Sequence, residues 1–127
     1  MSKQAIKPNL DRVFKTAWFS KAAKKAHIPD SELREAITQV IQGLADDLGG
    51  GVFKKRLNGN MHRSIILAKG GRYWVYEYLF AKQDRSNIDE AELAEFRVIA
   101  KAYASLSDEQ IEQLLVNKDL WEISNDC

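Results

Sequence analysis

The residues with the most obvious chemical use are basic side chains in the middle of the chain. No acidic residue occurs between Asp47 and Glu77, whereas seven basic residues do, namely Lys54, Lys55, Arg56, His62, Arg63, Lys69 and Arg72. Guanidinium and ammonium groups donate charge-assisted hydrogen bonds to phosphate oxygens, and clusters of them bind nucleic acid backbones. The pattern therefore predicts a surface for an anionic ligand, with a phosphate backbone as the best candidate.

Three basic residues, Arg56, Arg63 and Lys82, are predicted to meet at one edge of the sheet. Arg56 ends one strand-like run, Arg63 begins the next and Lys82 follows a third, so an antiparallel meander brings them to one edge of a sheet. Together they repel one another until a phosphate binds. Guanidinium groups can stabilise the negative charge that develops when a 2′-OH attacks the adjacent phosphate. A lysine whose pKa is lowered by neighbouring cations can accept or donate the proton. The cluster can therefore bind RNA or cut it.

Further basic residues are expected to contact RNA without taking part in the chemistry. These RNA-binding candidates are Lys54, Lys55, His62, Arg72 and Arg85. His62 is also a candidate for acid–base catalysis, but it flanks a turn, where a solvated histidine is the more common interpretation. Lys69 and Arg72 flank a Gly-Gly turn and are interpreted as solvated turn residues or peripheral phosphate contacts.

Other chemistries find no support in the sequence. His27 and His62 are the only histidines, the single cysteine is Cys127, and no HxxxH or CxxC spacing occurs. These residues do not suffice for a typical zinc site, and one cysteine cannot form an internal disulfide. Gly49-Gly50-Gly51 follows a predicted helix, whereas a phosphate-binding loop opens one. We therefore predict no metal and no other cofactor.

The basic residues lie on a predicted three-stranded antiparallel meander over residues 52–85. Its apolar runs are separated by Asn58-Gly59-Asn60 and by Gly70-Gly71, and Gly-Gly favours a two-residue type I′ hairpin. Alternation in the third strand directs Trp74, Tyr76, Tyr78 and Phe80 to one face and Tyr73, Val75, Glu77 and Leu79 to the other. Most of these aromatic residues are interpreted as core, and a tyrosine at the strand end is the best candidate for stacking on a base.

A short strand and two helices are predicted before the meander. Residues 12–16 form the strand, after which residues 17–26 form a helix that buries Trp18, Ala22 and Ala26. Pro29 ends this helix. The next helix, capped by Asp30 or Ser31, runs until Gly49-Gly50-Gly51 ends it. Its apolar positions recur at helical spacing, at Leu33, Ile37, Val40, Ile41 and Leu44.

Two helices and an extended segment are predicted after the meander. Asp89 with Glu92, and Ser107 with Gln110, have the spacing of capping boxes. The apolar positions that follow are Leu93, Phe96, Ala100 and Tyr103 in the first helix, Ile111, Leu114 and Leu115 in the second, and Leu120, Trp121 and Ile123 in the extended residues 118–127. The predicted fold class is α+β, a small and mostly antiparallel sheet flanked by N-terminal helices and a C-terminal helical pair.

Length and charge describe a single domain of two unlike parts. The domain spans residues 1–127, with residues 1–10 as a loose arm and residues 86–127 as an acidic helical extension. Residues 1–82 carry 15 Lys and Arg and 7 Asp and Glu, a net charge of +8, whereas residues 83–127 carry 4 and 11, a net charge of −7. This division favours an anionic partner for the first part. No apolar run approaches the roughly 20 residues of a membrane helix, and MSKQAIKPN lacks the apolar centre of a signal peptide. We expect a cytoplasmic protein without a membrane partner.

Three stretches resemble a known family, namely FKTAWFSKAAKKAHIPDSELREAI, GGGVFKKRL and HRSIILAKGGRYWVYEYLFAKQDRSNID. Over residues 14–123 the chain is similar to the RelE/HigB-type toxins of bacterial type II toxin–antitoxin systems, in the subgroup with a helical C-terminal extension. The resemblance implies a RelE-like fold. It also implies a ribosome-dependent endoribonuclease, or mRNA interferase, that enters the ribosomal A site and cleaves translated mRNA without a metal.

The resemblance also assigns roles and partners. The family's functional positions fall on Arg56, Arg63 and Lys82, with Lys54 and Arg85 as weaker matches. By this analogy Arg56 and Arg63 would stabilise the transition state, and Lys82 would move a proton. The expected partners are the ribosome, mRNA and a cognate antitoxin, often a helix-turn-helix DNA-binding protein, in a toxin–antitoxin hetero-oligomer.

Two other functions stay open on the sequence alone. Related toxins of the same fold poison DNA gyrase, so the fold does not decide the target. A non-enzymatic, basic RNA-binding regulatory module would also carry this charge pattern, and it would bind RNA with a steep salt dependence.

Overall fold

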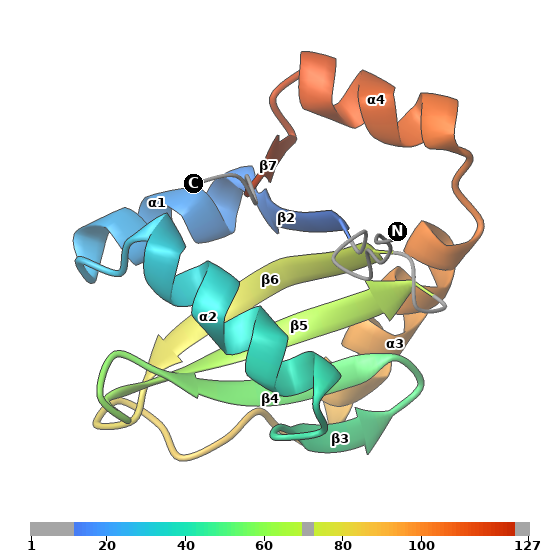
Figure 1. Cartoon of the computed structure of the whole chain (residues 1–127). Helices are drawn as coiled ribbons and strands as arrows, with labels where there is room; N and C mark the ends of the chain where they lie inside the picture. Colours follow the sequence, from blue (N-terminus) through green and yellow to red (C-terminus); the bar gives the residue numbers. More distant parts are fainter. Residues whose placement is uncertain (1–11, 70–72, 124–127) are drawn as a thin grey trace, which may run out of the picture.

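A computed structural model describes residues 12–69 and 73–123 of the chain (Figure 1). Over these residues the fold is α+β, with six strands in one sheet and four helices. In chain order the elements are β2 Arg12–Thr16, α1 Ala17–Lys25, α2 Asp30–Ile41, β3 Asp46–Gly49, β4 Val52–Leu57, β5 His62–Lys69, β6 Tyr73–Ala81, α3 Glu90–Ala104, α4 Asp108–Val116 and β7 Leu120–Glu122. No helix within these two ranges is long and apolar enough to cross a membrane.

The sheet has the strand order β3-β4-β5-β6-β2-β7. Neighbouring strands are antiparallel except β2, which pairs in parallel with β6. The predicted α+β class, the meander of β4, β5 and β6, the N-terminal strand and the short C-terminal strand are confirmed. The Gly70-Gly71 turn and the arm of residues 1–10 lie outside the described residues, so their predicted conformations stay predictions.

Helices cover both faces of the sheet and bury a core on each. α1 and α2 lie across one face, called here the α2 face, and α3 lies across the other, the α3 face, with α4 beside β7 (Figure 1). Buried residues of the α2 face include Phe19, Leu33, Val40, Ile66 and Tyr76. Those of the α3 face include Phe14, Val52, Ile65, Leu67 and Val75. The capping boxes predicted for α3 and α4 are both present, Asp89 with Glu92 and Ser107 with Gln110.

The buried side of α1 differs from the predicted one. α1 buries Phe19 and Ala23, whereas Trp18 is 52% exposed. The Thr16 side chain caps the helix by accepting a hydrogen bond from the Phe19 N–H, so the helix starts directly where β2 ends. Phe19 then faces the sheet, with its ring centroid 5.0 Å from that of Tyr76. The prediction that Trp18 is buried is wrong, because a stripe that starts at residue 19 has the same helical spacing.

The helix α2 has the predicted apolar stripe but different ends. Its N-cap is Pro29, which provides no side-chain hydrogen bond. The Asp30 carboxylate accepts a hydrogen bond from Lys15 Nζ at 2.7 Å instead of capping the helix. The last helical residue is Ile41, which is 50% exposed. Capping by Asp30 or Ser31 and burial of Ile41 are therefore wrong predictions.

The residues after α2 form β3, an edge strand that the sequence does not predict. Leu44, predicted to belong to the helix, is 59% exposed and precedes this strand. Gly49, Gly50 and Gly51 have φ of +86°, +67° and +84° and lead from β3 into β4. The prediction that they end the helix is wrong, because Gly43 at φ +92° already turns the chain away from it.

A β-bulge in β6 changes which side chains share a face. The register between β5 and β6 shifts between the pairs Ile65–Tyr78 and Ile66–Tyr76. Glu77 is therefore an additional residue without a partner in β5. The predicted alternation reverses beyond it, so Leu79 belongs to the α2 face, and Tyr78 and Phe80 belong to the α3 face. Their predicted faces are wrong, because strict alternation assumes a strand without a bulge.

Candidate functional site

Two arginines lie side by side on the α3 face, where the β4–β5 hairpin turns. Arg56 of β4 is paired directly with Arg63 of β5, and Arg63 with Phe80 of β6. Like charges on directly opposed strand positions repel and destabilise a sheet. An anion bound between them would remove this repulsion. We call Arg56 and Arg63 the arginine pair.

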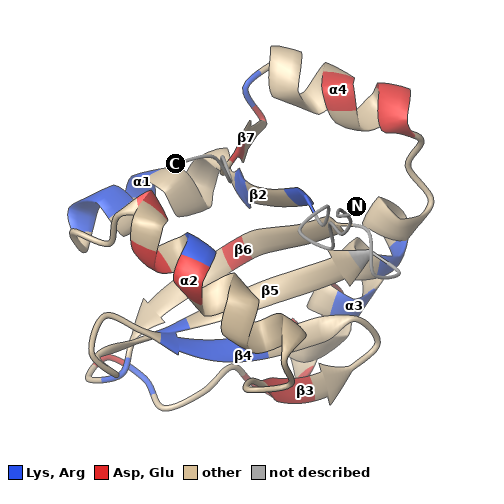
Figure 2. Cartoon of the chain, viewed as in Figure 1, with Lys and Arg blue, Asp and Glu red and all other residues tan. Residues whose placement is uncertain are grey.

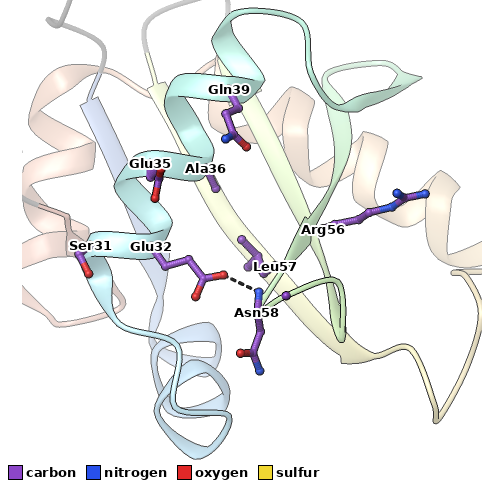
Figure 3. A pocket seen from close by; sticks show the side chains of 9 residues that line it. Ser31, Glu32, Glu35, Ala36, Gln39, Arg56, Leu57 and Asn58 are labelled. Carbon is purple, nitrogen blue, oxygen red and sulfur yellow. Dashed lines mark hydrogen bonds between the residues drawn. The ribbon is translucent and has the colours of Figure 1, made fainter.

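The arginine pair keeps most of its hydrogen-bond donors unused. Arg56 is exposed and makes no hydrogen bond or ion pair with another described residue. Its side chain extends away from α2 and from the polar residues of that helix (Figure 3). Arg63 Nη1 donates to the backbone oxygens of Asn60 and His62, at 3.0 and 3.2 Å. These two bonds orient the guanidinium without neutralising it, so its charge is available to a phosphate.

The turn that precedes Arg63 is fixed to α2. Asn58, Gly59 and Asn60 all have positive φ, of 55°, 61° and 74°. The Glu32 carboxylate of α2 accepts a hydrogen bond from the Asn58 N–H (Figure 3). This contact holds the turn whose Asn60 oxygen positions Arg63. Glu32 and Asn58 lie 26 positions apart, and the sequence contains no local signal for their contact.

Arg85 lies next to the arginine pair, but its guanidinium is paired with other groups of the protein. Its Cζ lies 5.5 Å from the centroid of the Phe80 ring, the aromatic neighbour of Arg63. Its Nη1 and Nη2 bond both carboxylate oxygens of Glu92, at 3.0 and 2.5 Å, and its Nε donates to the Asn87 oxygen at 3.0 Å. The hydrogen bond to Glu92 raises the pKa of Arg85, and the same bond lowers the pKa of Glu92. Arg85 therefore fixes the segment before α3 against β6, and its contact with RNA stays a prediction.

The three consecutive cations of β4 point to different faces. Lys54 shares the α3 face with Arg56, and its Nζ donates to Asn87 Oδ1 at 3.3 Å and lies 3.8 Å from Asp46 Oδ2. Lys55 points to the α2 face, where its Nζ donates to the Leu44 oxygen at 3.0 Å. Of the two lysines, Lys54 is therefore the one that lies next to the arginine pair. Arg72 lies outside the described residues.

Lys82 lies at the same end of the sheet as the arginine pair but in a different hollow. Its backbone N–H donates to the Met61 oxygen at 2.9 Å, which places it one residue beyond β6. It is exposed and lines a cavity of about 430 Å³ together with residues 59–62, 81 and 83. His62 belongs to this cavity, and its Nδ1 lies 3.1 Å from Asn58 Nδ2. Lys82 thus has His62 as its neighbour there, and Arg56 and Arg63 do not line that cavity.

An aromatic cluster beside the site was not predicted as a unit. The Tyr78 ring lies 5.1 Å from Trp18, 5.9 Å from Phe80 and 5.8 Å from Phe96 of α3, measured between centroids. The bulge at Glu77 is what turns Tyr78 toward Phe96. Because neither the bulge nor the exposure of Trp18 has a local sequence signal, periodicity alone could not find this cluster.

Charge is unevenly distributed over the described surface. Figure 2 shows basic residues along β4 and at the C-terminal end of α1, and acidic residues on α4 and β3. The acidic residues of α4 are thus spatially separate from the arginine pair, whereas α3 packs against β4 and β5 on the same face of the sheet. In the ranges that the structure describes, no group of three or more His, Cys, Asp or Glu side chains is arranged to hold a metal ion.

The family model described as RelE toxin of RelE / RelB toxin-antitoxin system matches residues 11–123. Since this match covers nearly the whole chain, the protein belongs to the RelE toxin family. A comparison with curated proteins gives no match. Family membership confirms the resemblance to RelE toxins and implies an antitoxin partner, and toxins of this family are typically endoribonucleases.

Proposed function

We propose that this toxin is a ribosome-dependent endoribonuclease that cleaves translated mRNA. The observation that carries the proposal is the arginine pair, two directly opposed cations with free donors and no carboxylate partner among the described residues. A scissile phosphate between Arg56 and Arg63 would receive hydrogen bonds from both guanidinium groups. Such donors act most strongly on the pentacoordinate transition state, because it carries more negative charge than the ground state.

The reaction proposed is attack by a ribose 2′-OH on the adjacent phosphorus. A 2′ O–P bond forms, the P–O5′ bond breaks, and the products are a 2′,3′-cyclic phosphate and a 5′-OH. One proton leaves the 2′-OH and one is delivered to the departing 5′ oxygen. Lys82 is proposed to move one of these protons, and His62 in the same hollow is the second candidate. Lys54, Lys55 and Arg72 would contact flanking phosphates.

The proposed partners follow from family membership and charge. The antitoxin, proposed to be a helix-turn-helix DNA-binding protein, would neutralise the toxin in a hetero-oligomer. The ribosome would present mRNA to the end of the sheet that carries the arginine pair, which would give a role to the basic residues on β4 and α1 (Figure 2). The place of action would be the cytoplasm.

The proposal is tested by inducing the toxin and its variants in growing cells and mapping RNA ends. Arg56→Ala, Arg63→Ala and Lys82→Ala are each expected to relieve growth arrest, with cleavage on purified translating ribosomes falling roughly 10²- to 10³-fold. Lys101→Ala, an exposed cation of α3, is the matched control and should stay toxic.

Two outcomes would redirect the interpretation. If folded Arg63→Ala and Lys82→Ala proteins both remain fully toxic, the assigned site is wrong. If wild-type toxin causes DNA damage without codon-phased cuts in translated messages, the target is a protein such as gyrase. Binding of RNA with a steep salt dependence but no cleavage on ribosomes would instead indicate a regulatory RNA-binding module.

A further inference from the structure

A groove between α1 and the end of β6 is lined by Trp18, a tryptophan that is not buried in the protein core. Trp18 is 52% exposed, and its indole stacks on the Tyr78 ring with centroids 5.1 Å apart and planes at 24°. The groove has a volume of about 450 Å³, and its lining includes Trp18, Ala22, Lys25, His62, Asp84 and Arg85. We call it the Trp18 groove.

We propose that the Trp18 groove binds one unpaired base of single-stranded RNA, which stacks on the Trp18 indole. The inference rests on the proposed endoribonuclease function and adds to it a place for a nucleotide next to the cleavage site. Proteins commonly bind single-stranded nucleic acids by stacking the bases on exposed aromatic side chains that have basic residues nearby, since every base has a π face. An indole already stacked on Tyr78 is held in one orientation, so little ordering is needed when a base binds.

The charges around the groove favour a polyanion. The helix α1 carries Lys21, Lys24 and Lys25 and no acidic residue, and all three lysines are exposed without an ion-pair partner among the described residues. Among the described residues Asp84 is the one acidic group that lines the groove, and Glu92 pairs with the Arg85 guanidinium. The net field at the α1 side is therefore positive, which suits the phosphates that flank a stacked base.

The groove adjoins the hollow that contains Lys82, the residue proposed to move a proton. His62 and Ala81 line both the Trp18 groove and the hollow that contains Lys82. An RNA strand bound at the end of the sheet that carries the arginine pair can therefore pass Lys82 and His62 before its next base reaches Trp18. The groove lining also includes the apolar residues Ala22, Ala26 and Leu79, so the three lysines of α1 are what favours RNA over an apolar helix of an antitoxin.

Substitutions at two exposed tryptophans separate stacking from packing. Trp18→Leu keeps an apolar cover on Tyr78 but has no π face, and Trp18→Phe keeps a π face. Trp121→Leu is the control, since Trp121 in β7 is 43% exposed and lies next to Lys118, not in the groove. On ribosomes programmed with a defined mRNA, Trp18→Leu is expected to lower kcat/KM at least five-fold, as loss of one stacked base implies. Trp18→Phe should retain most of it, and Trp121→Leu all of it.

A binding measurement keeps this inference separate from the proposed activity. Titration with a short oligoribonucleotide should quench the tryptophan fluorescence of a Trp121→Phe protein and should leave that of a Trp18→Phe protein nearly unchanged. Equal quenching in both proteins, or equal kcat/KM for Trp18→Leu and Trp121→Leu, would overturn the inference while the endoribonuclease stands. If wild-type toxin cuts no RNA at all, the proposed function fails, whereas quenching of Trp18 by RNA would still support the groove as a base-binding site.

Discussion

Replacing Glu77 with glutamine is expected to stabilise the protein at neutral and alkaline pH and to have no effect near pH 4. Glu77 is the extra residue of the β6 bulge, and its Oε1 is buried without a hydrogen-bond partner among the described residues. Burial raises the pKa of Glu77 to about 7, from an ordinary value of 4.5. No described cation offsets this effect. Folding therefore works against ionisation of this carboxyl group.

The size of the effect follows from the two pKa values. A pKa difference of one corresponds to about 1.4 kcal/mol, so the rise from 4.5 to about 7 corresponds to roughly 3 kcal/mol. Because Glu77 is only half-buried as a residue, solvent screening reduces this, and we expect about 2 kcal/mol. A raised carboxyl pKa means that the folded state holds its proton more tightly. The contribution of Glu77 to the free energy of unfolding is therefore greatest below pH 4.5, falls as the pH rises toward 7 and is constant above pH 7.

The measurement is the free energy of unfolding from urea titrations between pH 4 and pH 9. Glu77→Gln should match wild type near pH 4, where Glu77 is neutral, and should exceed it by about 2 kcal/mol at pH 8, a rise in Tm of roughly 8 °C. Glu95→Gln, an exposed glutamate of α3, is the control and should show no such trend. A difference that does not change with pH, or a less stable Glu77→Gln protein at pH 8, would refute the reasoning.

Two further substitutions test contacts that hold the C-terminal helices to the sheet. Gly50→Ala should lower the free energy of unfolding by about 2 kcal/mol, because φ is +67° and the new Cβ would lie 2.8 Å from Arg97 Cγ. Gly59→Ala, with φ +61° and no atom within 4 Å, should lose only about 1 kcal/mol, and equal losses would show that the Arg97 contact is unimportant. Glu92→Gln should lower Tm at pH 7, because Arg85 lowers the pKa of Glu92 and thereby stabilises the ionised form. This loss should vanish as the pH falls through that lowered pKa, and a loss that persists in acid would contradict the ion pair.

The features that the sequence predicted well are those with local physical signals. The starts of α3 and α4 follow from capping boxes in which Asp89 and Ser107 satisfy backbone N–H groups three residues on. The pairing of Arg56 with Arg63 follows from the Asn58-Gly59-Asn60 turn between them, since a short hairpin fixes the register of its strands. The proximity of Arg56 and Arg63 could therefore be predicted without a structure, whereas Lys82 lies in a separate hollow.

The features that the sequence missed depend on contacts between distant residues. Both sides of α1 have helical apolar spacing, and only the packing of Phe19 on Tyr76 decides which one is buried. β3 contains two aspartates, residues disfavoured in strands, and forms because β4 offers it an edge. Arg85 was predicted to contact RNA as a weaker match to the family's functional positions, whereas its structural partner Glu92 was predicted only as a capping residue. Each of these outcomes depends on contacts between residues that are far apart in the sequence.

The bulge that destabilises β6 is also what completes the surroundings of the arginine pair. If the pairing of Ile66 with Tyr76 continued without an extra residue, Arg63 would face Leu79, and Phe80 would lie one position further along. With Glu77 inserted, Phe80 is the partner of Arg63, and Arg85 can stack on its ring. The same shift turns Tyr78 toward Phe96 and sets Lys82 one residue past the strand end. The buried Glu77 carboxyl group is thus the local consequence of the register that places Phe80 and Arg85 beside the candidate site, and bulges are often found next to functional residues.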